Sequence, residues 1–431
     1  MLGSLGHRVR TAALTFARWA PSAGFSLLLA SIVAIALVNS TFGPNLGALW
    51  HTEFGFVLGG STFQMPLLDW IDDALLTVFF LVVGLEIKRE FTVGHLASRR
   101  AAALPIAAAV GGMVLPAVIY RLVVPQGPWS AGWGVPMATD TAFALAIIAL
   151  MGARVPVELR IFLTAASIVD DIGAIILVAI FYSGDLRVAY LVAAAAITTL
   201  LGLMNRAGIY HAMPYVLAGV ALWACVYTGG LHATLAGIIL AAFIPTRPPP
   251  DFKTLALQAD AILTSEALHH GEQFRRGPSA PAMEALDAIH DRLESPADRM
   301  LRNVAPLSSY FVLPVFALAN AGITIGSESF NGRGLLMLSI VAGLTIGKPL
   351  GFALASALAV GLHLAERPRA YTWRQLTGAG ALAGVGFTMS LFIAGQAFPR
   401  AEDFAVAKIA VFAASMLSAV LGTALLWRAS A

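Results

Sequence analysis

The sequence predicts an all-α, polytopic membrane protein that crosses the bilayer twelve times, with two of its helices interrupted inside the membrane. Hydrophobic residues make up 58% of the chain, charged residues only 12%, and the mean hydropathy is +0.80. Soluble domains carry about 25% charged residues. Apolar segments close to the ~20 residues that cross a bilayer recur along almost the whole length. We therefore predict one membrane domain over residues 1–431.

The apolar segments divide the chain into a regular series of helices. The first follows basic residues, as a secretory signal does, but its length and the many later segments favour an uncleaved helix. The predicted spans cover residues 22–40, 68–87, 101–121, 131–151, 159–182, 188–204, 213–228, 231–245, 305–325, 334–362, 376–397 and 405–427.

The basic residues between the spans predict the orientation. With a cytoplasmic N-terminus, most lysines and arginines fall on the cytoplasmic side, including Arg8, Arg10 and Arg18. The loop from 41 to 64 holds neither lysine nor arginine. The positive-inside rule therefore places both termini in the cytoplasm. The net charge of +3 does not indicate a nucleic-acid partner, because the basic residues lie between apolar segments and not in one patch.

Two connecting segments are long enough to have structure of their own. Residues 41–66 form the predicted periplasmic loop, and the alternation that begins at Glu53 favours a β-hairpin there. Residues 246–304 form a predicted cytoplasmic insertion with the densest charge in the chain. Apolar residues at three and four spacing within 256–263 and 282–293 predict two amphipathic helices on the membrane face. A solvated connector and a regulatory element both fit this insertion.

Two spans contain signals for a break. In the fourth span Gly132, Gly134 and Pro136 come directly before Thr139 and Asp140, which is a helix stop followed by a helix start. Either of the last two residues is a suitable cap for the new helix, whose positive dipole end favours a carboxylate. The eleventh span repeats the pattern, with four glycines between 378 and 386 ahead of a Phe-Thr-Met-Ser run. Interrupted helices at matching places in spans three to five and ten to twelve indicate a transporter's binding site.

Four ionisable residues lie deep within predicted spans: Asp140, Asp170, Asp171 and Lys348. A charge at the centre of a membrane helix costs about 2.5 to 3.5 kcal/mol on insertion scales, so such residues usually mark ion pathways. Consecutive helical residues point about 100° apart, so the aspartate pair can border one cavity without facing one point. A structural ion pair between Lys348 and one aspartate is an alternative, but it leaves the other two acids unexplained.

Seven short motifs occur in an order similar to that of the NhaA-type sodium/proton antiporters of bacteria. The resemblance runs from about residue 20 to 425. It implies inverted three-helix repeats with two discontinuous crossing helices, a known property of that family. The motifs are Gly84-Leu-Glu-Ile-Lys-Arg-Glu, Ala138-Thr-Asp-Thr-Ala-Phe-Ala-Leu, Ile168-Val-Asp-Asp-Ile-Gly-Ala-Ile, Leu231-His-Ala-Thr-Leu-Ala-Gly, Pro314-Val-Phe-Ala-Leu-Ala-Asn-Ala-Gly, Gly347-Lys-Pro-Leu-Gly and Gly384-Val-Gly-Phe-Thr-Met-Ser.

The resemblance implies roles for the membrane-embedded residues. Asp170 and Asp171 would bind Na⁺ and protons in turn. Thr139 and Asp140 would lie where the broken helices cross, with Asp140 offsetting positive helix ends. Lys348 would offset negative helix ends and pair with Asp170 when no sodium is bound.

The resemblance also implies a pH-responsive cluster at the end of the second span, formed by Glu86, Lys88, Arg89 and Glu90, together with the start of the ninth span. His232 would influence the same response from the periplasmic side. Family members often carry a glutamate where this chain has Leu301, so the network is expected to differ here. For the surface charges a solvated rim is an equal alternative, since exposed pairs contribute little. A satisfied interfacial histidine is an equal alternative for His232.

The implied function is electrogenic exchange of cytoplasmic Na⁺, or Li⁺, for external H⁺ across the bacterial inner membrane. Sodium is a hard cation that seeks oxygen ligands, and protons bind the same carboxylate oxygens, so the two ions compete. Two aspartates suggest two protons per sodium, as in the family. The resemblance also implies pH regulation and a homodimer joined through the periplasmic hairpin, within the lipid bilayer. No cofactor is expected, and the protein is not expected to be an enzyme.

Three other classes of protein fit less well. An intramembrane aspartyl protease needs two acids that face each other from different helices, not neighbours on one helix. A carrier of an organic solute would show more aromatic and hydrogen-bonding residues at the midplane. A passive cation channel is the better alternative, since it too uses buried acids. The exchanger interpretation also requires that water reach Asp170 and Asp171.

Overall fold

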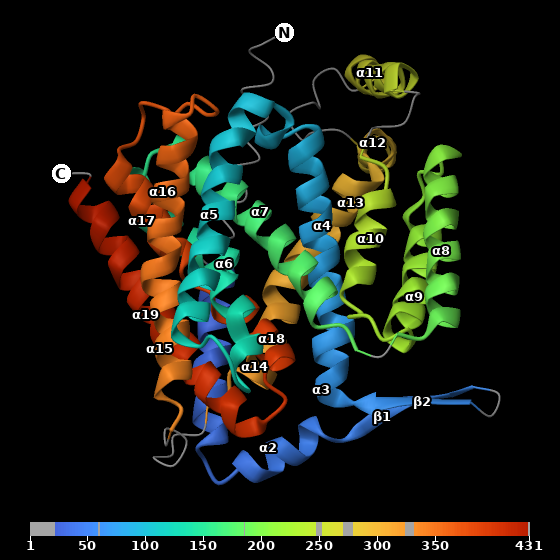
Figure 1. Cartoon of the computed structure of the whole chain (residues 1–431). Coiled ribbons are helices and arrows are strands. Elements are labelled where there is room, and N and C mark those ends of the chain that lie inside the picture. Colours follow the sequence, from blue (N-terminus) through green and yellow to red (C-terminus); the bar gives the residue numbers. More distant parts are fainter. Residues whose placement is uncertain are drawn as a thin grey trace.

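The computed structural model describes residues 22–58, 61–184, 186–246, 252–269, 279–323 and 332–429. These residues form a bundle of helices with one small β-hairpin at its edge (Figure 1). The expectations for the basic residues ahead of the first span lie outside the described residues, as do parts of the predicted 246–304 insertion, at 247–251 and 270–278.

The first half of the chain contains the hairpin and the first interrupted helix. Its elements are the helix Ser22–Val38, α2 (Gly43–Trp50), β1 (Glu53–Leu58), β2 (Ser61–Pro66), α3 (Leu67–Asp69), the π-helical turn η1 (Trp70–Leu75), α4 (Leu76–Thr92), η2 (His95–Ala97), α5 (Arg99–Val123), the 3₁₀ segment η3 (Ser130–Met137), α6 (Thr141–Met151), η4 (Gly152–Arg154) and α7 (Val157–Phe181).

The second half consists of helices and the loops between them, with no strand among its described residues. Its elements are α8 (Val188–Arg206), α9 (Ala212–Thr228), α10 (Leu235–Phe243), α11 (Phe252–His269), α12 (Ala280–Leu293), α13 (Pro296–Leu307), the π-helical turn η6 (Ser308–Val312), α14 (Leu313–Asn320), α15 (Gly334–Ala342), the π-helical turn η8 (Gly343–Gly347), α16 (Lys348–Gly361), α17 (Trp373–Ala383), α18 (Phe387–Ala397) and α19 (Ala401–Ala429).

The described helices include seven that are long and apolar enough to cross a membrane, and two bent pairs raise that number to nine. The chain is therefore a multi-pass membrane protein. The predicted spans at 68–87, 213–228 and 231–245 correspond to helices that are shorter or interrupted, with 17 residues in α4, 17 in α9 and 9 in α10. The number of twelve crossings remains a prediction.

One end of the bundle carries α2 and the hairpin. The helix Ser22–Val38 and α2 meet at 113°, so α2 runs across the helix ends beside the strands (Figure 1). β1 and β2 pair antiparallel, from Glu53 opposite Pro66 to Leu58 opposite Ser61. Trp70 fastens this hairpin to the bundle, because its Nε1 donates to the Phe54 carbonyl at 2.9 Å and its ring stacks on Trp223.

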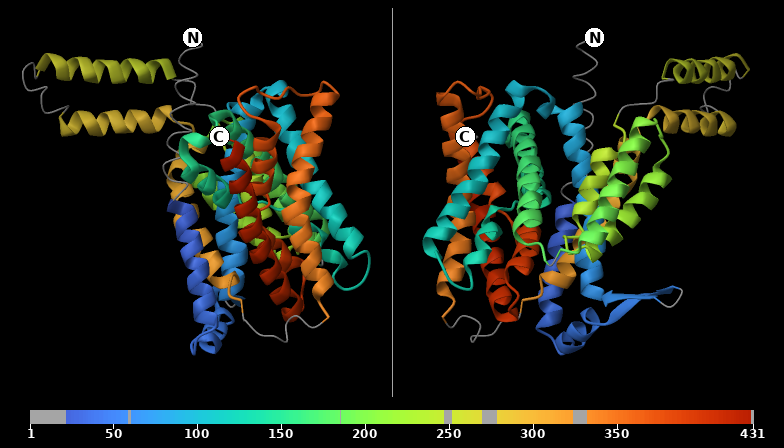
Figure 2. Two further views of the ribbon diagram at one scale, coloured as in Figure 1. Left: turned by 90° about the vertical axis from the view of Figure 1, so that its left-hand side faces the viewer. Right: turned by 45° about the vertical axis from the view of Figure 1, so that its right-hand side comes forward.

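The opposite end carries α11 and α12, which lie side by side and across the direction of the bundle helices (Figure 2). The carboxylate of Glu266 near the end of α11 accepts from the backbone N–H and the hydroxyl of Ser279 at 3.0 and 2.7 Å. The two helices are thus joined at one end by a capping interaction. This pair and the β-hairpin mark the two opposite faces of the molecule.

Helices α5 and α16 pack against each other over an extended contact, and glycines permit their close approach. A Cβ added to Gly351 would lie 2.1 Å from the Gly111 carbonyl oxygen, and one added to Gly112 would lie 2.3 Å from the Phe352 ring. Small residues at a crossing allow membrane helices to approach backbone to backbone. This contact fixes α16, and with it Lys348, at the centre of the molecule.

Candidate ion-binding site

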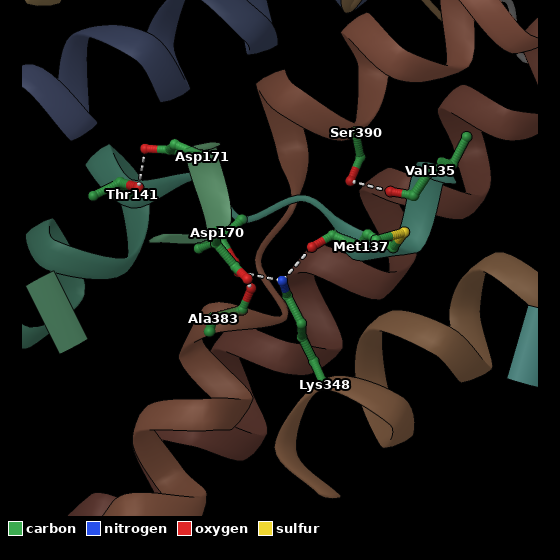
Figure 3. Close-up of polar contacts among 9 residues, drawn as sticks. Val135, Met137, Thr141, Asp170, Asp171, Lys348, Ala383 and Ser390 are labelled. Carbon is green, nitrogen blue, oxygen red and sulfur yellow. Dashed lines mark hydrogen bonds and ion pairs between the residues drawn. The ribbon is translucent and has the colours of Figure 1, made fainter. Parts of the chain in front are cut away.

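The two interrupted helices touch at their breaks. The backbone N–H of Asp140, in the break between η3 and α6, donates to the Val385 carbonyl in the break between α17 and α18, at 2.6 Å. Nearby, the hydroxyl of Ser390 donates to the Val135 carbonyl at 2.8 Å (Figure 3). Glycine and proline end the helices here, and the backbone groups that the helices leave unpaired bond across the crossing.

Asp140 caps two helices at once. Its Oδ1 accepts from the backbone N–H of Phe143 at 3.2 Å, in the first turn of α6. Its Oδ2 accepts from the backbone N–H and the hydroxyl of Thr388, in the first turn of α18, at 3.0 and 2.5 Å. Asp140 is 2% exposed. Its negative charge therefore faces the partial positive charge of two helix N-termini in a region shielded from water.

Asp170 and Lys348 form a buried ion pair. The ammonium of Lys348 donates to Oδ2 of Asp170 and to the carbonyl of Met137, and both charged side chains are 0% exposed (Figure 3). Met137 is the last residue of η3, so the cation lies at the negative end of that helix. The Lys348 ammonium is thus stabilised by the Met137 carbonyl as well as by Asp170.

Thr139 joins the ion pair to the second broken helix. Its hydroxyl lies 2.5 Å from Oδ2 of Asp170 and 2.8 Å from the carbonyl oxygen of Ala383, at the end of α17. One hydroxyl proton serves only one of these two acceptors at a time. When it bonds Ala383, the hydroxyl oxygen is able to accept a hydrogen bond from a protonated Asp170. The contact therefore suits both charge states of this carboxyl.

Asp171 points in another direction from the same helix. Its Oδ2 accepts from the hydroxyl of Thr141 at 3.2 Å, on the first turn of α6 (Figure 3). Oδ1 of Asp170, by contrast, is buried and has no hydrogen-bond partner among the described residues. The pair thus places carboxylate oxygens, two threonine hydroxyls and the Ala383 carbonyl in one small region at the crossing.

Both residues of the pair are almost wholly buried in this conformation. Asp170 is 1% exposed and Asp171 is 7% exposed. One and two turns further along α7 lies a cavity of only about 10 Å³, lined by Phe80, Ala174, Ile175, Val178, Thr234, Leu235, Met389, Phe392 and Ile393. A cavity of this size holds at most about one water. The access that the exchanger interpretation requires therefore depends on a conformational change.

The four residues of the predicted pH-responsive cluster lie together on the last turns of α4, on the face of the molecule that bears α11 and α12. Lys88 donates to the carbonyls of Ala242 (2.8 Å) and Ile244 at the end of α10. Arg89 pairs with Asp298 of α13 at 3.5 Å, with side chains 52% and 39% exposed. Glu86 and Glu90 are half-buried beside them.

Leu301 lies in the apolar packing near this cluster. It is 7% exposed and belongs to a buried group with Leu85, Ala297 and Met300. A charged side chain at this position would face the same apolar neighbours, which disfavour it.

His232 lies apart from the α4 residues, in the turn before α10. Its Nε2 is 2.7 Å from the Tyr182 carbonyl oxygen at the end of α7, and its ring lies edge-on to Phe392. The structure therefore brings together Thr139, Asp140, Asp170, Asp171 and Lys348, and keeps His232 and the α4 cluster in two separate regions.

Three polar residues escaped the sequence analysis as site residues: Thr141, Thr388 and Asn320. Thr388 follows the second break much as Asp140 follows the first, which is a signal that the pattern contained. Asn320 donates to Oδ1 of Asp72 at 2.6 Å, across 248 positions of sequence. No local pattern predicts a contact of that kind.

Comparison with known proteins gives the family of this chain. Residues 15–426 match the sequence model of a family described as Na⁺/H⁺ antiporter 1. A protein named Na⁺/H⁺ antiporter NhaA from Nitrosospira multiformis is 62% identical over 443 aligned positions, which cover 100% of this chain and 71% of that protein. Proteins of the same name from Helicobacter pylori strain HPAG1 and Wolinella succinogenes are 40% and 39% identical over 93% and 96% of this chain, and over 91% and 92% of their own lengths.

A solved structure of the sodium proton antiporter MjNhaP1 from Methanocaldococcus jannaschii aligns with a TM-score of 0.45 and 11% identity. The alignment covers 100% of this chain and 98% of that one. The family match and the relatives settle the assignment. The chain belongs to the family of NhaA-type Na⁺/H⁺ antiporters.

Proposed function

We propose that this chain exchanges cytoplasmic Na⁺, or Li⁺, for external H⁺ by competition at Asp170 and Asp171. The names of its relatives support the choice of ions. One observation carries the mechanism: the carboxylate of Asp170 is paired with Lys348 inside the crossing of the two broken helices, where both side chains are 0% exposed. The Lys348 ammonium is the cationic partner of this buried carboxylate, and a metal cation is able to take its place.

The oxygen atoms at the crossing suit a hard cation. Oδ1 of Asp170 has no partner among the described residues, and Thr139, Ala383 and Asp171 supply further oxygens nearby. Hard cations bind carboxylate, hydroxyl and carbonyl oxygens. An arriving Na⁺ would take over the charge compensation that the Lys348 ammonium supplies, because two cations at one carboxylate repel each other. The lysine would then withdraw towards the Met137 carbonyl, which it already contacts.

Protons compete with the metal ion for the same atoms. A protonated carboxyl is a poor ligand for Na⁺, and neighbouring carboxyl groups titrate as one coupled unit. Two acids at the site would return two protons for each sodium that leaves. One net charge would then move in each cycle, so the membrane potential would contribute about 2.3 kcal/mol per 100 mV to the exchange.

The burial of the aspartate pair favours a carrier over a channel. Exposures of 1% and 7% leave the pair almost wholly buried, with no wide opening to either face among the described residues. A carrier that alternates between two faces passes through such a closed state, whereas a channel conducts through a continuous pathway. Because the crossing joins both broken helices, we infer that they move together when the site changes sides.

The remaining assignments follow from the same proposal. We place the face with α11, α12 and the α4 cluster in the cytoplasm, because the basic loops are concentrated there. The segment 246–304 then lies on the cytoplasmic surface, and 41–66 with its hairpin lies in the periplasm, where it would join two copies as a homodimer. The cluster of Glu86, Lys88, Arg89 and Glu90 would adjust the exchange to pH by its contacts with α10 and α13.

Transport in everted membrane vesicles tests the proposal. Addition of NaCl or LiCl to vesicles with an imposed pH gradient should collapse that gradient in the parent protein. Asp170→Asn and Asp171→Asn should each abolish the signal, while Asp260→Asn, at an exposed position of α11, should leave it intact. Sodium-driven proton movement that persists in Asp171→Asn would refute the competition mechanism. Reconstituted protein that carries sodium current without proton movement would establish a channel instead.

A further inference from the structure

A groove runs along the outer surface of the bundle between α6 and α19. It measures about 420 Å³ and is lined by Ile147, Ala419, Val420, Thr423, Ala424 and Trp427. Val420 is 69% exposed and Trp427 is 53% exposed. Both helices belong to membrane-spanning segments, Ser130–Met151 and Ala401–Trp427, and α19 faces the viewer in the left view of Figure 2. The groove therefore opens towards lipid.

A cation lies at the end of this groove. Arg154 follows α6 in the short segment η4, and its guanidinium carbon lies 3.8 Å from the centre of the Trp427 ring. Within the part of the chain that the structure describes, no carboxylate or carbonyl contacts the N–H groups of Arg154. The turn that carries it is held in place, because Arg160 donates to the Gly152 carbonyl and Gly152 has a positive φ of 58°.

Arg154 and the apolar groove together match the two parts of a phospholipid, its charged headgroup and its acyl chain. A guanidinium stacked on an aromatic ring keeps its N–H edge available for bidentate contact with a phosphate. Tryptophan and arginine at the end of membrane helices lie at the depth of the lipid headgroups. Below them the lining of the groove is almost entirely apolar, as an acyl chain requires.

We propose that this groove binds one anionic phospholipid, with the phosphate on Arg154 and an acyl chain along Ile147 and Val420. The site is distinct from the aspartate pair and takes no part in the exchange chemistry. A free phosphate ion would use Arg154 alone and leave the apolar lining empty. A second copy of the chain would cover the apolar lining and have no need of the cation.

Native mass spectrometry of the full chain in detergent tests the site, with phosphatidylglycerol or phosphatidylcholine added. Arg154→Gln removes the headgroup contact, and Val420→Trp fills the groove without changing charge. Arg154→Gln should lower the affinity for phosphatidylglycerol by about tenfold, the effect of losing one good charge-assisted contact. Val420→Trp should lower it as well, by excluding the acyl chain. The matched controls are Arg369→Gln, at an exposed arginine on another loop, and Val192→Trp, at an exposed valine of α8. Both should bind lipid as the parent does.

Several outcomes would overturn the proposal. Equal retention of phosphatidylglycerol in the parent and in both groove variants would show that lipid binds elsewhere. Equal retention of phosphatidylcholine would show that the groove holds ordinary surrounding lipid without selecting its headgroup. Equal binding of glycerol phosphate, which has no acyl chain, would reduce the site to an anion contact. A dimer that dissociates in Val420→Trp would assign the groove to a second copy of the chain.

Discussion

Lys348 and Asp170 share a buried ion pair in which neither side chain is exposed to solvent. Each is also held by a backbone or hydroxyl group from a broken helix, Met137 for the lysine and Thr139 for the aspartate. Two charges taken out of water gain little net stability from each other, but removal of one leaves the other uncompensated. The predictions below begin from this asymmetry.

Loss of Lys348 alone should destabilise the protein more than loss of the whole pair. Lys348→Met leaves a buried carboxylate without its cation, a change that costs about 3–5 kcal/mol in comparable buried pairs. The double variant Lys348→Met with Asp170→Leu removes both charges and should recover most of that loss. Thermal unfolding in detergent measures the difference. A double variant no more stable than the single one would show that the pair is not the cause.

Asp140 should contribute more to stability than a single helix cap. Its carboxylate caps α6 and α18 together, and one cap is usually worth about 0.5–2 kcal/mol. Asp140→Ala should therefore lower the free energy of unfolding by up to twice that amount, and Thr388→Val by less. Thr377→Ala, at a partly buried position of α17 where the hydroxyl donates to the Trp373 carbonyl of the same helix, serves as the control in the same melting experiment. Equal melting of all three variants would contradict the double-cap description.

The crossing of α5 and α16 should tolerate no side chain at Gly351. A Cβ there would overlap the Gly111 carbonyl oxygen at 2.1 Å, so Gly351→Leu should separate the helices and displace Lys348. We expect loss of folded protein or of transport. Gly361→Leu is the matched control in the same helix, because a Cβ at Gly361 meets nothing within 4 Å. Size-exclusion chromatography and vesicle transport of the two variants make the comparison.

The α4 cluster should respond unequally to substitution. Lys88 holds two carbonyls at the end of α10, whereas Arg89 and Asp298 form an exposed pair, which is worth only about 0–1 kcal/mol. Lys88→Met should therefore shift the pH profile of exchange clearly, and Asp298→Asn should shift it little. Fluorescence dequenching that follows sodium-driven proton movement, recorded between pH 6.5 and 9, would measure the shift in each variant. A larger shift for Asp298→Asn would place the sensing role in the ion pair.

The sodium requirement should rise steeply as pH falls. In the proposed mechanism protons and Na⁺ compete for the same oxygens, so each proton that must leave raises the apparent KM for Na⁺ by up to roughly tenfold per unit fall in pH. Two coupled carboxyls give a limiting slope near −2 in a plot of log KM against pH, and one gives a slope near −1. Initial rates at several pH values yield the slope. A KM that does not change with pH would exclude competition.

The sequence predicted the breaks and the buried charges because their signals are local. Glycine and proline beside Thr139 mark the end of one helix and the start of another, and Lys348 stands out in an apolar run. The position of the second break followed from its own glycines. The roles of these residues depend on where they lie relative to one another, which local signals do not give. The expected roles came from the family resemblance.

Contacts between distant elements could not be predicted in the same way. Asp140 and Thr388 are separated by 248 positions, and their contact depends on how two helices cross. The 113° bend before α2 depends on where the chain leaves the bundle. The closure of the site against water likewise follows from packing around Asp171, which composition does not encode.

The bond between the Asp140 N–H and the Val385 carbonyl belongs to the backbone alone. Mutation at either position therefore leaves this link between the two broken helices in place, with proline at 140 as the exception. Side chains at the crossing can therefore be exchanged while the mechanical connection between the two broken helices stays unchanged.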